Sequence, residues 1–133
     1  MKMPVSQEVQ EELHKVVGKH VYGNLYEVDV ANLTEVEKLK DIVINSAKEG
    51  NLHIIEMMVK KLNSYNQFPG GVSIIALIEE SHIALHTWPE SRYATLDIYS
   101  CGDDSNPEKA FRYVIAKLAP KRYKTFKADR STR

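Results

Sequence analysis

Four polar residues, Glu79-Glu80-Ser81-His82, separate two apolar segments near the middle of the chain. They offer two carboxylates, a hydroxyl and an imidazole, which proteins use as nucleophiles and as general acids or bases. A tight connection between two apolar strands usually favours glycine, so reactive residues at this junction point towards chemistry. From these residues alone, however, a polar turn that carries surface charges is the simpler interpretation.

A second polar group follows in the same segment, where His86 comes five residues after Ser81. Because side chains alternate along a strand, His82 and His86 share one face and Ser81 lies on the other. In an unbroken strand Ser81 and His86 therefore cannot meet. They can meet only if the chain turns at residues 81–82, or if it is cut there and the new end moves.

Two other functions fit parts of the sequence. His82 and His86 could bind zinc together with Cys101 and Asp97, because all four are ligand types that zinc accepts. The C-terminal residues 121–133 mix basic and aromatic side chains, a pattern that could bind RNA. A strand with one solvated face explains the same pattern equally well.

The composition limits the classes of partner. The chain has 133 residues, which favours one domain, and its 18 basic and 18 acidic residues cancel. Nothing global therefore attracts nucleic acid or an anionic membrane. The single cysteine excludes an internal disulfide and suits a reducing compartment, and the longest strictly apolar run, Ile74–Ile78, is far too short to span a membrane. We expect a soluble cytoplasmic protein.

Hydrophobic periodicity predicts the elements that must position these residues. Strands are expected over residues 19–29, 53–62, 72–78, 83–88, 93–100 and 123–128, and helices after Asn32 and Asn106. This order predicts an α+β fold of two layers, with two helices on one face of a mainly antiparallel sheet of about six strands. The other face would need cover, which a partner chain could supply.

Several motifs at fixed separations resemble a known signature. They are Gly71-Val-Ser73, Glu80-Ser-His-Ile83, His86-Thr-Trp-Pro-Glu90 and Cys101-Gly102. In order and spacing they are similar to the prokaryotic pyruvoyl-dependent S-adenosylmethionine decarboxylases. The resemblance implies that family's fold, with a polar N-terminal extension over residues 1–17 and one domain over 18–133. It also implies self-cleavage between Glu80 and Ser81, giving chains 1–80 and 81–133.

The resemblance further implies a role for each motif residue. Ser81 would become a covalent pyruvoyl group, which forms a Schiff base with the substrate. Ser73 and His86 match the processing residues, and Cys101 matches the proton donor of the decarboxylation. The family also implies a homo-oligomer with its sites near subunit boundaries.

The substrate depends on which branch the chain resembles. The segments Gly18–Val21, Gly23–Tyr26, Glu79–His86 and Pro120–Ser131 are similar to archaeal arginine decarboxylases of the same family. We therefore expect arginine, with S-adenosylmethionine as the alternative; both belong to polyamine synthesis. Glu90 and Asp129 could pair with a guanidinium, whereas Phe68 and Trp88 could stack on adenine or contact a sulfonium.

Overall fold

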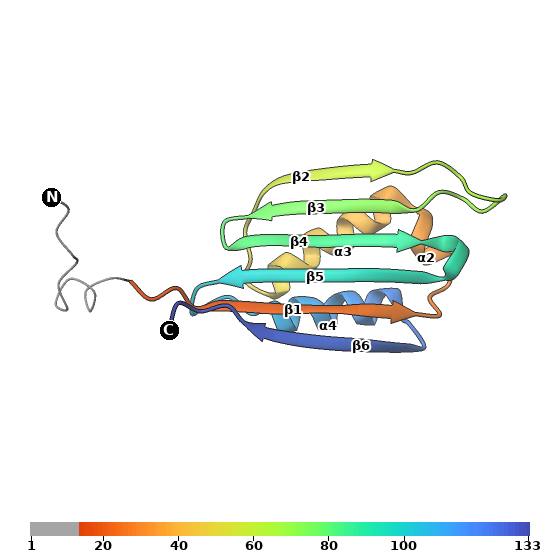
Figure 1. Ribbon diagram of the computed structural model, residues 1–133. Coiled ribbons are helices and arrows are strands. Elements are labelled where there is room, and N and C mark those ends of the chain that lie inside the picture. Colours follow the sequence, from red (N-terminus) through yellow and green to blue (C-terminus); the bar gives the residue numbers. More distant parts are fainter. Residues whose placement is uncertain (1–13) are drawn as a thin grey trace, which may run out of the picture.

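Residues 14–133 of the computed structural model form one layer of strands and one layer of helices (Figure 1). The sheet has six strands in the order β2-β3-β4-β5-β1-β6, and every neighbouring pair is antiparallel. The strands are β1 (Gly18–Tyr26), β2 (Ile54–Lys61), β3 (Val72–Ile78), β4 (Ser81–Trp88), β5 (Tyr93–Cys101) and β6 (Arg122–Asp129). The predicted α+β fold is confirmed.

The helices α3 (Val36–Glu49) and α4 (Pro107–Leu118) lie on the same face of the sheet. Asn106 caps α4, because its side chain accepts a hydrogen bond from the backbone N–H of Lys109 at 3.0 Å. The single helix expected after Asn32 is divided instead. A short helix α2 (Ala31–Thr34) ends at Glu35, whose extended backbone (φ −91°, ψ 112°) separates it from α3.

The hydrophobic core fills the space between the helices and one face of the sheet. Alternate side chains of β3, β4 and β5 are buried there, including Ile74, Ile83 and Leu96, and they meet the apolar stripes of α3 and α4. Among residues 14–133, no helix lies on the opposite face (Figure 1). On that face Ile75 and Leu77 stay half exposed, at 47% and 49%, so the sheet presents uncovered apolar area.

Two features concern the ends of the chain. The backbones of Val16 and Thr132 are hydrogen bonded at 3.0 Å, and the N–H of Gly102 donates to the carbonyl of Val17 at 2.9 Å. Contacts to the sheet therefore begin just before β1, whereas most of the predicted extension lies outside the described residues. Within residues 14–133, no helix is long and apolar enough to cross a membrane.

Candidate active site

The junction between β3 and β4 is a tight reverse turn made by Glu79 and Glu80, so Ser81 is the first residue of β4. The chain thus turns two residues before residues 81–82, the position considered from the sequence. Ser81 has a positive φ of 153°, a region that residues with side chains seldom adopt, at a cost on the order of 1–3 kcal/mol. Backbone strain is therefore placed next to the Glu80–Ser81 peptide bond.

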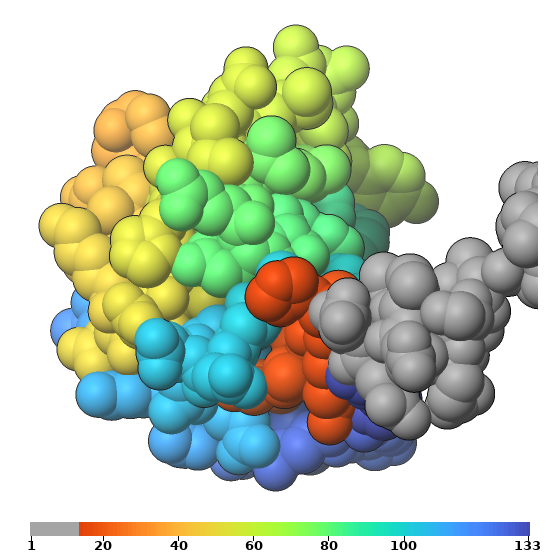
Figure 2. Space-filling view, turned by 90° about the vertical axis from the view of Figure 1, so that its left-hand side faces the viewer, coloured from red at the N-terminus to blue at the C-terminus, as the bar shows by residue number. Residues whose placement is uncertain are grey.

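A hydrogen bond from β5 fixes that peptide. The backbone N–H of Cys101 donates to the carbonyl oxygen of Glu80 at 2.9 Å. This donor polarises the carbonyl and would stabilise negative charge on its oxygen if the carbon were attacked. The end of the sheet that carries this turn is exposed in Figure 2, where the green segment near residue 80 is bordered by yellow residues near position 50 and by cyan residues after β5.

The side chain of Glu80 is held by His53, which precedes β2. One carboxylate oxygen accepts the backbone N–H of His53 at 3.0 Å, and the other lies 2.6 Å from Nδ1 of its ring. Burial alone would raise the pKa of Glu80, but these hydrogen bonds outweigh it and lower the pKa below 4.5. The hydrogen bond and the charge of Glu80 raise the pKa of His53 above 6.5. The sequence analysis missed His53, because an isolated histidine before a strand carries no signal of its partner.

Ser73 and His86, which the sequence predicts to act together, are cross-strand partners on β3 and β4. Nδ1 of His86 lies 2.9 Å from Oγ of Ser73. Both side chains project from the uncovered face of the sheet. Five residues of extended strand separate His86 from Ser81, a distance of ~17 Å, so one chain does not bring this pair to the Glu80–Ser81 peptide.

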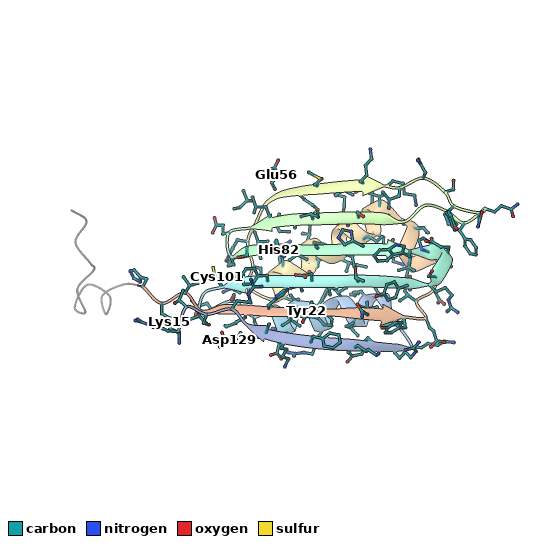
Figure 3. All side chains as sticks on the ribbon, viewed as in Figure 1. Lys15, Tyr22, Glu56, His82, Cys101 and Asp129 are labelled. Carbon is teal, nitrogen blue, oxygen red and sulfur yellow. The ribbon has the colours of Figure 1, made fainter. Side chains whose placement is uncertain are left out.

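Cys101 ends β5 at the edge of the sheet that carries the turn (Figure 3). The residue is partly exposed. Strand alternation places it on the same uncovered face as Ser73 and His86. The thiol therefore opens towards the surface on which a second layer would pack.

The four expected substrate contacts lie away from Ser81. Trp88 closes the far end of β4, ~24 Å along the strand, and Glu90 follows it in the short 3-10 helix η1 (Pro89–Ser91). Phe68 belongs to the loop before β3, at the same far end. Asp129 is on β6, three strands from β4 and thus ~14 Å away. A single chain therefore does not assemble these residues around Ser81.

Asp129 instead borders a cleft of about 740 Å³ between β1, β6 and the start of α4. Hydrogen bonds from the side chain and the backbone N–H of Ser131 lower the pKa of Asp129. The carboxylate is therefore ionised over a wide pH range and already partly engaged within its own chain.

The residues proposed for zinc do not converge. Asp97 Oδ1 lies 2.9 Å from Nε2 of His20 and 3.2 Å from Nε2 of His82, whereas His86 is bonded to Ser73. Across the described part of the chain, no group of three or more His, Cys, Asp or Glu side chains is placed to hold a metal ion. The histidines therefore serve hydrogen bonding on the uncovered face.

Comparison with known proteins identifies the family. The S-adenosylmethionine decarboxylase family matches residues 19–131. The arginine decarboxylase proenzyme of Hyperthermus butylicus is 50% identical over 117 residues, which cover 88% of this chain and 80% of that protein. The crystal structure of the adenosylmethionine decarboxylase from Aquifex aeolicus VF5 superposes with a TM-score of 0.78 at 34% identity, covering 88% of this chain and 92% of that one. The chain therefore belongs to the S-adenosylmethionine decarboxylase family, a family of pyruvoyl-dependent decarboxylase proenzymes.

Proposed function

We propose that this proenzyme cleaves itself between Glu80 and Ser81 and converts Ser81 into its pyruvoyl group. The observation that supports this most directly is the hydrogen bond from the Cys101 N–H to the Glu80 carbonyl. It lies at a turn whose next residue, Ser81, has a strained backbone. The nucleophile, the electrophile and an oxyanion donor are thus adjacent.

The chemistry uses the residues of this turn. Oγ of Ser81 attacks the carbonyl carbon of Glu80, and the Cys101 N–H stabilises the resulting oxyanion. The C–N bond then breaks, the nitrogen takes up a proton, and an ester joins the two halves. Removal of the Cα proton of Ser81 breaks its Cβ–O bond, releases Glu80 as a carboxylate and leaves dehydroalanine. Tautomerisation and hydrolysis by one water release ammonia and complete the pyruvoyl group.

The base for this sequence comes from a second copy of the chain. In one chain His86 is ~17 Å along β4 from Ser81, and the side chains of Ser73 and His86 face the uncovered sheet surface. A second copy packed on that surface would bury Ile75 and Leu77, half exposed in one chain, and would bring its own His86 to the turn. The active unit is therefore a homodimer or a larger assembly, and an active monomer in sedimentation at assay concentration would contradict this.

In the mature enzyme, residue 81 would hold the pyruvoyl group, whose ketone would supply an electrophile for the substrate amine and an electron sink for the decarboxylation. We expect Cys101 to return a proton to the substrate carbon, because this partly exposed residue ends β5, the neighbour of the strand that begins with Ser81. The backbone N–H of Cys101 would thus serve the self-cleavage, and its thiol would serve the decarboxylation. The single cysteine also suits a cytoplasmic protein.

Arginine is the substrate we propose, with agmatine as the product in polyamine synthesis. The support is the 50% identity to an arginine decarboxylase proenzyme, against 34% to an adenosylmethionine decarboxylase of known structure. Glu90 or Asp129 would bind the guanidinium, and the distances within one chain require either residue to come from a second copy. S-adenosylmethionine is the alternative, because Phe68 and Trp88 offer exposed aromatic surfaces.

Two measurements test the proposal. Intact mass should show chains of 80 and 53 residues (133 − 80 = 53), the second blocked to Edman degradation, and an active uncut chain would refute self-cleavage. Labelled CO₂ should then be released from arginine and not from S-adenosylmethionine. The reverse pattern would overturn the substrate while leaving the cleavage chemistry intact.

A further inference from the structure

We propose that His53 is a positioning residue for the self-cleavage: it holds the Glu80 side chain, so that the acyl half of the Glu80–Ser81 peptide stays fixed and its charge is neutralised beside the reacting carbonyl. This inference rests on the proposed cleavage site. It concerns a residue outside every motif of the sequence, on the loop between α3 and β2.

The contacts form a clamp around the turn. The backbone N–H and the ring of His53 bind the two carboxylate oxygens of Glu80 separately, at 3.0 and 2.6 Å. The backbone carbonyl of His53 also accepts the N–H of Glu79 at 2.9 Å. On the opposite side, Cys101 donates to the Glu80 carbonyl. Glu80 is thus held through its carbonyl by β5 and through its side chain by His53. In the proposed attack, the Ser81 hydroxyl moves towards a carbonyl that is already fixed.

The charge of His53 is a second reason to assign it a role in the cleavage. Attack by Ser81 places a negative charge on the carbonyl oxygen of Glu80, and a free carboxylate on the same residue would oppose it. A protonated His53 cancels that carboxylate. The pKa of His53 is raised by the Glu80 hydrogen bond first and by the charges of Glu80 and Glu79. These two carboxylates are the charged groups that act on its ring among the described residues.

The same clamp fits the product. After cleavage Glu80 carries its side-chain carboxylate and a new terminal carboxylate. The Glu80 side chain is only 15% exposed, whereas that of His53 is 58% exposed, so the imidazole covers the glutamate from the solvent side. The new chain end therefore stays docked beside residue 81.

The test follows the cleavage rate after refolding or cell-free synthesis of the full chain, by intact mass over time. His53→Ala should slow cleavage by about tenfold, the size expected when a hydrogen bond to a charged group is lost. His53→Asn returns a side-chain N–H near the position of Nδ1 without the charge, and should recover part of the rate. His14→Ala, at an exposed histidine before β1, is the matched control and should cleave like the wild type.

A double-mutant cycle separates positioning from general loss of structure. If His53 acts through Glu80, then His53→Ala should slow the Glu80→Gln protein little further. The ratio of wild-type to His53→Ala rates should also fall as pH rises through the raised pKa of His53, because any pH dependence that the two proteins share cancels in this ratio. Cleavage of His53→Ala at the wild-type rate, or equal effects of His53→Ala with and without Glu80→Gln, would overturn the role of His53. An uncut wild type would instead refute the proposed cleavage.

Discussion

The two ends of β4 differ in what they hold. At its start, Ser81 follows the Glu79–Glu80 turn, where Glu80 accepts a hydrogen bond from Cys101 of β5 and its side chain is held by His53. Towards its other end, His86 pairs with Ser73, and Trp88 packs against Tyr93 with ring centroids 5.4 Å apart. An extended strand cannot fold back on itself, so the nucleophile at one end and the imidazole near the other stay apart. The difference is the reason for the proposal that a complete site combines residues from two copies of the chain.

The largest expected effect is the loss of the nucleophile. Ser81→Ala should remain one uncut chain without decarboxylase activity, because the substitution removes the hydroxyl that makes the proposed attack. Intact mass measures the outcome. The control at the opposite end is Ser91→Ala in η1, which should cleave like the wild type, and cleavage of the Ser81→Ala protein would place the reaction elsewhere.

Complementation between copies tests the separation of the two ends directly. Ser81→Ala and His86→Ala should each stay uncut when expressed alone. When the two are expressed together, some His86→Ala chains should be cut, because a neighbouring Ser81→Ala chain supplies its intact His86. Tags of different mass identify the cut chain. If the mixture stays uncut although mixed oligomers form, then each chain uses its own His86, and the proposal that His86 acts on a second copy is wrong.

Cys101→Ala should separate cleavage from turnover. The N–H that contacts Glu80 belongs to the backbone and survives the substitution, so cleavage should proceed. Decarboxylation should fall by ~10²–10⁴-fold, as expected when a positioned acid is removed. Intact mass and labelled CO₂ release measure the two steps, and undiminished turnover in the cut variant would leave the thiol with a packing role only.

The smallest effect concerns stability and pH. In the uncut Ser81→Ala chain, the His53–Glu80 pair should stabilise the fold only where both partners are charged. Its contribution should be lost as pH rises through the raised pKa of His53, above 6.5, and as pH falls through the lowered pKa of Glu80, below 4.5. The melting temperature with and without His53→Ala, measured across this range, checks the window, and a pH-independent difference would rule it out.

The sequence predicted the strands and the second long helix because local patterns determine them. The apolar run Val72–Ile78 and the Asn106-Pro107 start are such patterns. The family resemblance singled out Ser73 and His86, but their contact was found only in the structure. The break at Glu35 was missed because neither glycine nor proline marks it. Three expected substrate contacts lie near the motifs in sequence, namely Phe68, Trp88 and Glu90. The length of β4 nevertheless puts ~24 Å between Ser81 and Trp88. The role of His53 could not be predicted, because the sequence does not show that the loop before β2 lies against the β3–β4 turn.

The strand order has one more consequence. Residues 1–80 contribute β1, β2 and β3, whereas residues 81–133 contribute β4, β5 and β6, and β1 lies between β5 and β6. Once cut, the domain is a complex of two interleaved polypeptides, and neither could form this sheet alone. Its unfolding then becomes a dissociation, so the mature protein should melt at a temperature that rises with its concentration. Refolding would become a bimolecular encounter, which makes the intact precursor the form that has to fold first.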